Sequence, residues 1–267
     1  MAVTFVGAEA AQNSAASISV PWPAGIQAGD VAILSWNNSN GVSWTTPSGF
    51  TLLDSELSGG SQEGRIYYKV LDGNESGSLT LTHSGTNKQT GILAVYRGVD
   101  PDDPIDAYAV RVETSDSTSH ACPQVVTVAA DAPAVVVIQE RFTDSSTNYT
   151  APSGYVKRAQ PVPFGGGGST SAGIADDGLS VSRPGGTTVT PPPWTDGEFT
   201  DNVLTWTITL TPDAGEAHSG SATMTASLAM AAAGTPDVDG AGQITATLGM
   251  TGTGSPDVAG GTGLITG

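Results

Sequence analysis

Residues 30–36 read Asp-Val-Ala-Ile-Leu-Ser-Trp, an almost unbroken apolar run that ends at the polar cluster Asn37-Asn-Ser-Asn-Gly41. An apolar run of this length, bounded by turn residues, is typical of a strand buried on both faces. A second such run, Ala134-Val-Val-Val-Ile138, lies in the other half of the chain. After a polar loop each run is followed by Pro-Ser-Gly and an aromatic residue, at Pro47–Phe50 and at Pro152–Tyr155. The sequence therefore predicts a β protein with two related halves.

Alternating apolar and polar residues predict further short strands, and 35 glycines and 17 prolines separate them. No long helical period occurs, so we expect an all-β fold, a jelly-roll-like β-sandwich followed by a short β-repeat tail. We assign residues 1–112 to the first half, 113–212 to the second half and 213–267 to the tail. The additional strands are expected at Ile18–Val20, Ser43–Thr45, Phe50–Asp54, Arg65–Leu71, Ser78–Thr82, Gly91–Arg97, Val125–Val128 and Val203–Thr211.

The tail contains a 20-residue repeat. Met224–Gln243 and Ile244–Gly263 are identical at nine of twenty positions. One unit has too little apolar bulk to bury a core, so such units become stable by packing on neighbours or on other chains. Their apolar residues alternate, which places them on one face of a strand. We expect an assembly face in a homo-oligomer, with a trimer favoured, made by Met224, Leu228, Met230, Ile244, Leu248 and Met250.

Charge and targeting signals narrow the classes of function. The chain has 9 basic and 26 acidic residues, a formal net charge of −17. Such a surface repels phosphate backbones and anionic lipids, so we expect neither nucleic-acid nor membrane binding. No apolar run approaches a membrane span. The start Met1-Ala-Val-Thr-Phe-Val has no basic or apolar signal region, which predicts synthesis in the cytoplasm without secretion.

The sequence marks out no catalytic centre. His83, His120 and His218 lie in separate loop-like segments without metal-ligand spacing, so we interpret them as solvated histidines. No Gly-x-Ser-x-Gly elbow occurs, and Cys122 is the one cysteine. Four carboxylates within Asp100–Asp106 could hold Ca²⁺, but an acidic turn is the favoured interpretation. We therefore predict no enzyme, no cofactor and no metal ligand.

Two tryptophans are candidates for glycan contact. Trp44 and Trp194 lie near turns, and an indole combines an apolar face with a polar N–H. Trp36 and Tyr67 lie in apolar strand contexts and are expected in the core.

Several of these motifs together resemble a known group of modules. They are Ile26-Gln-Ala-Gly-Asp30 before the apolar strand, the two Pro-Ser-Gly-aromatic turns, Ala94-Val-Tyr-Arg-Gly-Val99 and Trp206-Thr-Ile-Thr-Leu-Thr-Pro212. Their order over residues 3–212 resembles β-sandwich, jelly-roll-like modules of bacterial surface proteins and tailed-bacteriophage structural proteins. The repeats over 219–267 are similar to those of minor tail, fibre and head-decoration proteins of phages that infect high-GC Gram-positive bacteria.

The resemblance implies a non-enzymatic structural protein of a phage virion, in contact with other virion proteins. It does not distinguish minor tail, fibre-like and capsid-decoration roles. The alternative is a carbohydrate-binding module that recognises a cell-surface glycan on the host. A glycan-degrading enzyme is a third hypothesis, for which no pair of carboxylates stands out.

Overall fold

A computed structural model describes residues 2–39, 42–60, 62–142, 148–161, 168–200 and 202–214. These residues form fifteen β-strands and no helix, so the all-β prediction is confirmed. They therefore contain no helix that is long and apolar enough to cross a membrane. The predicted assembly face in the tail lies outside the described residues.

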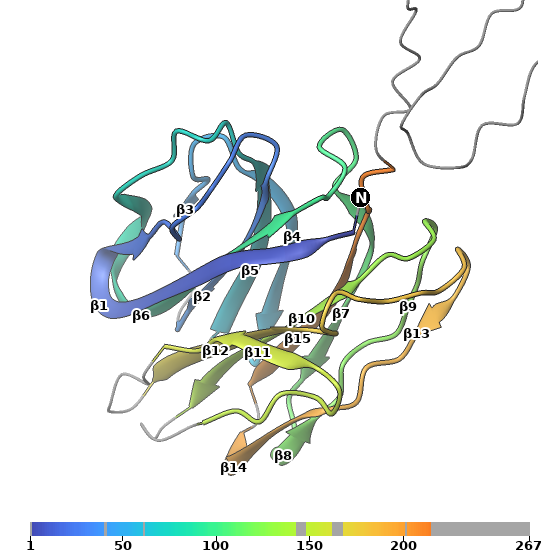
Figure 1. Cartoon of the computed structure of the whole chain (residues 1–267). Helices are drawn as coiled ribbons and strands as arrows, with labels where there is room; N and C mark the ends of the chain where they lie inside the picture. The colour runs from blue at the N-terminus through green and yellow to red at the C-terminus, as the bar shows by residue number, and fades with distance from the viewer. Residues whose placement is uncertain are drawn as a thin grey trace, which may run out of the picture. The chain divides into compact units, whose positions relative to one another are not determined.

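Two larger antiparallel sheets and two small ones make up the fold (Figure 1). The first sheet contains β1 (Thr4–Pro21), β2 (Val31–Asn38), β3 (Trp44–Thr45), β4 (Thr51–Ser58), β5 (Gln62–Val70) and β6 (Ser78–Arg97). The second contains β7 (Ile105–Glu113), β10 (Ala134–Phe142), β11 (Val156–Ala159), β12 (Ser169–Asp176) and β15 (Val203–Leu210). The small sheets pair β8 (Ser117–His120) with β14 (Trp194–Thr200), and β9 (Val125–Val126) with β13 (Thr188–Val189).

The two larger sheets have the same strand order. The first runs β1-β6-β2-β5-β4 and the second β7-β15-β10-β12-β11. When the five main strands of each sheet are counted along the chain, both sheets have the spatial order first, last, second, fourth, third. The Pro-Ser-Gly-aromatic turns take equivalent positions, directly before β4 and β11. Phe50 N donates to Pro47 O and Tyr155 N donates to Pro152 O, at 3.1 and 2.9 Å. The repeated sequence pattern thus corresponds to a repeated topology.

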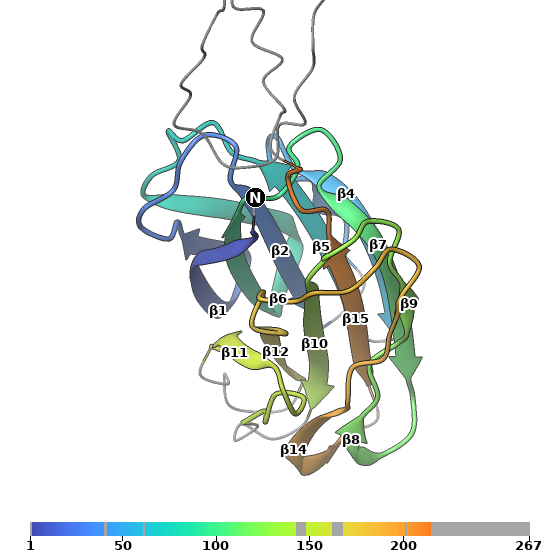
Figure 2. The ribbon, with the colours of Figure 1, turned by 45° about the vertical axis from the view of Figure 1, so that its right-hand side comes forward.

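A shared apolar core lies between the two larger sheets. Alternate residues of β2 and β10 point into it, among them Val31, Ile33, Val135 and Val137. The strands β2 and β10 are also buried on their other faces, where Ala32 and Leu34 join one apolar cluster and Val136 and Ile138 another. The prediction of strands buried on both faces is therefore confirmed, and burial on both faces explains why these runs show no alternation. Figure 2 lets the two layers of strands be followed from the side.

Polar side chains also connect the sheets. Asn37 Nδ2 donates to the main-chain oxygens of Glu140 and Ser171, at 2.9 and 3.0 Å. Gln139 Nε2 donates to Ser35 Oγ at 2.8 Å, and Trp206 Nε1 donates to Asp54 Oδ2 at 2.9 Å. Hydrogen bonds between buried side chains of the two sheets restrict how the sheets can slide.

Several sequence-based assignments change in the structure; the expected strand Ile18–Val20, for example, is the end of the longer strand β1. The expected strands Ser78–Thr82 and Gly91–Arg97 are parts of one strand, β6, which pairs with β1 along most of its length. The strand β7 was not expected, because the prolines of Asp100–Asp106 suggested a break. It pairs with β15, so residues 105–112 lie in the second sheet although we assigned them to the first half.

Candidate functional site

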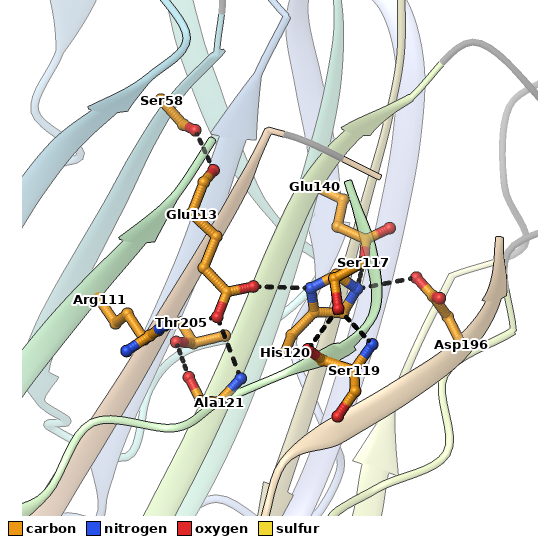
Figure 3. Close-up of polar contacts among 10 residues, drawn as sticks. All are labelled: Ser58, Arg111, Glu113, Ser117, Ser119, His120, Ala121, Glu140, Asp196 and Thr205. Carbon is orange, nitrogen blue, oxygen red and sulfur yellow. Dashed lines mark hydrogen bonds and ion pairs between the residues drawn. The ribbon is translucent and has the colours of Figure 1, made fainter. Parts of the chain in front are cut away.

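The most unusual polar feature of the described residues is a histidine surrounded by three carboxylates. His120 ends β8, Glu113 ends β7, Glu140 lies on β10 and Asp196 lies on β14. His120 Nδ1 is 2.9 Å from Glu113 Oε2, and His120 Nε2 is 3.2 Å from Asp196 Oδ2 and 3.4 Å from Glu140 Oε1. Figure 3 shows the imidazole between the carboxylates. We call these four residues the acid–histidine cluster.

The local strand pattern explains why the carboxylates meet. Val136 and Ile138 of β10 belong to the apolar cluster on the outer face of the second sheet, and Glu140 is two residues further along this face. Trp194 is fully buried in the same cluster and is two residues before Asp196 on β14. The pairing of β14 with β8 brings His120 opposite Trp194. The acid–histidine cluster is therefore a polar continuation of an apolar interface.

The cluster is enclosed and incompletely bonded. The exposed fractions of His120 and Glu140 are both 0%. Neither carboxylate oxygen of Glu140 has a hydrogen-bond partner of good geometry, and the same holds for Tyr149 Oη and Ser171 Oγ nearby. Burying an ionised carboxylate without a partner is costly. The geometry thus requires either protons or a cation at Glu140.

Burial and the neighbouring charges shift the pKa values of three residues in the acid–histidine cluster. Burial alone would lower the pKa of His120, but hydrogen bonds to Asp196 and Glu113 and the charge of Glu140 raise it to about 9. Burial, reinforced by the neighbouring Asp196, raises the pKa of Glu140 well above its ordinary value. Burial also opposes ionisation of Glu113, yet bonds from His120 and Arg111 lower the pKa of that carboxyl. Without a metal ion, a protonated His120 beside an ionised Glu113 and a neutral Glu140 agrees with these pKa shifts.

Two of the three histidines are not solvated, contrary to our interpretation of the sequence. His120 is fully buried and His83 is 3% exposed. His83 Nδ1 lies 3.1 Å from Ser84 O, and its ring packs near Trp36 and Trp44. His218 lies outside the described residues. The error arose because sequence spacing does not show which distant strands cover a loop.

The proposed glycan contacts also change. Trp194 is fully buried, so its assignment as an exposed candidate is wrong. Trp44 is half-buried, with Trp36 edge-on at 4.4 Å between ring centroids and the Arg65 guanidinium 4.8 Å from its ring centroid. The buried Trp194 has no face for a sugar, and the Arg65 guanidinium already covers one face of Trp44. Trp36 and Tyr67 lie in the core, as predicted.

The acidic stretch and the cysteine have structural surroundings. Asp106 accepts a bond from Val128 N at 3.0 Å and from Thr209 Oγ1 at 2.9 Å, so its carboxylate stabilises a loop. Asp100 accepts a bond from Asp102 N at 2.9 Å within a turn. These contacts support the acidic-turn interpretation. Cys122 is a buried free thiol whose pKa burial raises to about 12.

Sequence reasoning missed Glu113, Glu140 and Asp196. The one local signal is Gln139-Glu140, where a charged residue directly follows the apolar run 134–138 in a strand that is otherwise buried on both faces. Comparison with known proteins adds no assignment, since the chain matches no family model, no curated protein and no solved structure.

Proposed function

We propose that the protein is a non-enzymatic structural component of a tailed-phage virion that assembles in several copies. The observation that carries the proposal is the 20-residue repeat over 224–263, which follows a complete β-sandwich. The sandwich is stabilised at its end by Asp213 N, which donates to Gly98 O at 2.8 Å. A repeat with one apolar face and little bulk needs another surface to cover it.

The enclosure of the acid–histidine cluster supports a non-enzymatic role. General acid–base chemistry requires the acid or base to come within hydrogen-bond distance of the substrate. His120 and Glu140 are both fully buried, so a substrate cannot come within hydrogen-bond distance of either side chain in this arrangement of the chain. The cluster therefore fits a stabilising role better than a catalytic one. The −17 charge favours solubility of a protein present in many copies.

Assembly is tested first by mass photometry of the full chain and of full-length variants with Leu228→Asp and Leu248→Asp. We expect an oligomer, most simply a trimer with closed symmetry, that dissociates in the double variant. A chain ending at Ala214 should be a monomer. If all forms are monomeric, self-assembly is refuted, and docking of the tail on another virion protein takes its place. Mass spectrometry of intact virions tests the virion assignment itself.

Carbohydrate binding is the second candidate, on different residues from those the sequence suggested. An open depression is lined by Tyr68 of β5, Tyr108 of β7 and the carboxylates of Asp102 and Asp103. Tyr108 is 45% exposed, and tyrosine together with carboxylates can stack on and hydrogen-bond to a sugar. A glycan array on the full chain and on Tyr108→Ala tests this: binding lost in the variant supports recognition, and no binding by either chain rejects it.

A further inference from the structure

We propose that His120, Glu140 and Asp196 bind one divalent cation of the zinc class, which connects the small β8/β14 sheet to the second large sheet. Each residue offers one ligand atom, and these three atoms lie within 4.8 Å of one another. The ligands come from three strands, β8, β10 and β14. An ion here would therefore be a structural cross-link.

Two of the three ligand-atom separations match those of a zinc site, and all three are within 4.8 Å. Ligands about 2.0–2.2 Å from a tetrahedral zinc ion are about 3.3–3.5 Å from each other. His120 Nε2 lies 3.2 Å from Asp196 Oδ2 and 3.4 Å from Glu140 Oε1. An ion between the three residues would need only small side-chain movements.

Unpaired buried atoms are the second, independent observation. Both oxygens of Glu140, which is 0% exposed, lack hydrogen-bond partners of good geometry. The hydroxyl of Tyr149, also buried and without a partner of good geometry, is in the same region and could donate a hydrogen bond to Glu140 or accept one from a metal-bound water. A bound cation would satisfy Glu140 directly, which the imidazole cannot do because its Nε2 is already 3.2 Å from Asp196.

Glu113 has the position of an outer-shell carboxylate. Metal-bound histidines usually donate their second ring N–H to a carboxylate, which orients the ring and raises its basicity. His120 Nδ1 meets Glu113 Oε2 at 2.9 Å, and Glu113 is in turn fixed by Arg111 Nε at 2.8 Å and by Ala121 N at 3.1 Å. With a neutral imidazole, three carboxylates, Arg111 and a divalent ion, the charges sum to zero.

The ligand set selects the class of ion. One imidazole with two carboxylates suits zinc and neighbouring transition metals, whereas Ca²⁺ takes six to eight oxygen ligands and Mg²⁺ retains several waters. The competing occupant is a pair of protons, one on His120 and one on Glu140, which gives the same total charge. Glutamine mimics a protonated Glu140 but cannot replace it as an anionic ligand.

The experiment uses the full chain, unfolded and refolded either with Zn²⁺ or with a chelator, followed by removal of free ion. We expect about one zinc per chain by elemental mass spectrometry of these samples. In separate thermal scans with free zinc kept at a hundredfold excess over its Kd, we expect a Tm about 5–10 °C higher than in the chelated sample. Glu140→Gln should fold, contain no zinc and show the same Tm under both conditions. Glu113→Gln should still bind zinc, with a Kd about 10–100-fold weaker.

His83→Asn is the matched control, since it removes another buried histidine, one that bonds to a main-chain oxygen instead of a carboxylate, and it should retain the zinc. The proposal is overturned if wild-type chain refolded with Zn²⁺ contains less than about a tenth of an equivalent, or if Glu140→Gln retains it. It is also overturned if Ca²⁺ raises the Tm and Zn²⁺ does not. Wild type and Glu140→Gln with equal, chelator-independent Tm values would identify protons as the occupant.

Discussion

Replacing Gly64 by alanine tests the packing of the two large sheets at one atom. Gly64 lies on β5 and faces the second sheet, where an added Cβ would be in contact with Gln139 Oε1, 2.6 Å from Leu204 Cδ1 and 2.9 Å from a ring carbon of Trp206. Its backbone needs no glycine conformation, because its φ is not in the left-handed region. Any loss of stability in Gly64→Ala would therefore come from close contact between the two sheets and not from backbone strain.

The size of the effect follows from what must move. Overpacking a core by one methyl group costs about 1–3 kcal/mol. Displacing Gln139 also breaks its 2.8 Å bond to Ser35, which adds about 1 kcal/mol. We expect a total near 3 kcal/mol, and for a domain of about 200 residues this lowers Tm by roughly 6–12 °C.

The assay is urea unfolding followed by tryptophan fluorescence, with calorimetry for Tm. Gly197→Ala on β14 is the control, because no heavy atom lies within 4 Å of its added Cβ and its φ is not positive. We expect the control within about 0.5 kcal/mol of wild type, or slightly more stable. If Gly64→Ala is as stable as the control, the two sheets do not meet at this point and the proposed sandwich packing is wrong.

Three further results are expected. Trp206→Phe should lose about 1–2 kcal/mol in urea unfolding, because the half-buried Asp54 carboxylate loses its indole donor; an unchanged midpoint would contradict this bond. Cys122 should resist a thiol reagent at pH 8 in the native protein and react fully in urea, since burial raises its pKa to about 12; rapid native labelling would show that the thiol is accessible. Burial opposes ionisation of Glu75, but Lys69 and main-chain donors lower its pKa below 4.5. Its contribution to the free energy of unfolding is therefore present above about pH 4.5 and is lost as the pH falls through the folded pKa. In thermal scans Glu75→Gln should lose less stability than wild type on acidification, and identical Tm–pH profiles of the two proteins would refute this.

Much of the fold was predictable because it depends on short-range signals. The runs at 30–36 and 134–138 identified the two central strands, β2 and β10, since short apolar runs bounded by turn residues are typical of strands buried on both faces. The repeated Pro-Ser-Gly-aromatic turns indicated two related halves, and equivalent strands follow them. By contrast β7 was missed, because prolines at 101 and 104 are strong local breakers and its pairing with β15 is long-range.

The candidate site was not predictable in the same way. Glu113, His120, Glu140 and Asp196 are separated by up to 83 positions, and no spacing rule connects residues on strands of different sheets. Trp194 illustrates the same difficulty, since turn residues surround it in sequence while the chain around Tyr149 buries it in space.

The sequence alone determined the β class, the duplicated organisation, the acidic surface and the repeat at the end of the chain, because composition and periodicity act locally. Only the tertiary structure decided which polar residues are buried together, because strand pairing and sheet packing bring together side chains that are distant in sequence. Burial then changes their chemistry: Glu140 is one of 26 acidic residues in the sequence, but in the fold it is an enclosed carboxylate 3.4 Å from His120 that requires a proton or a cation.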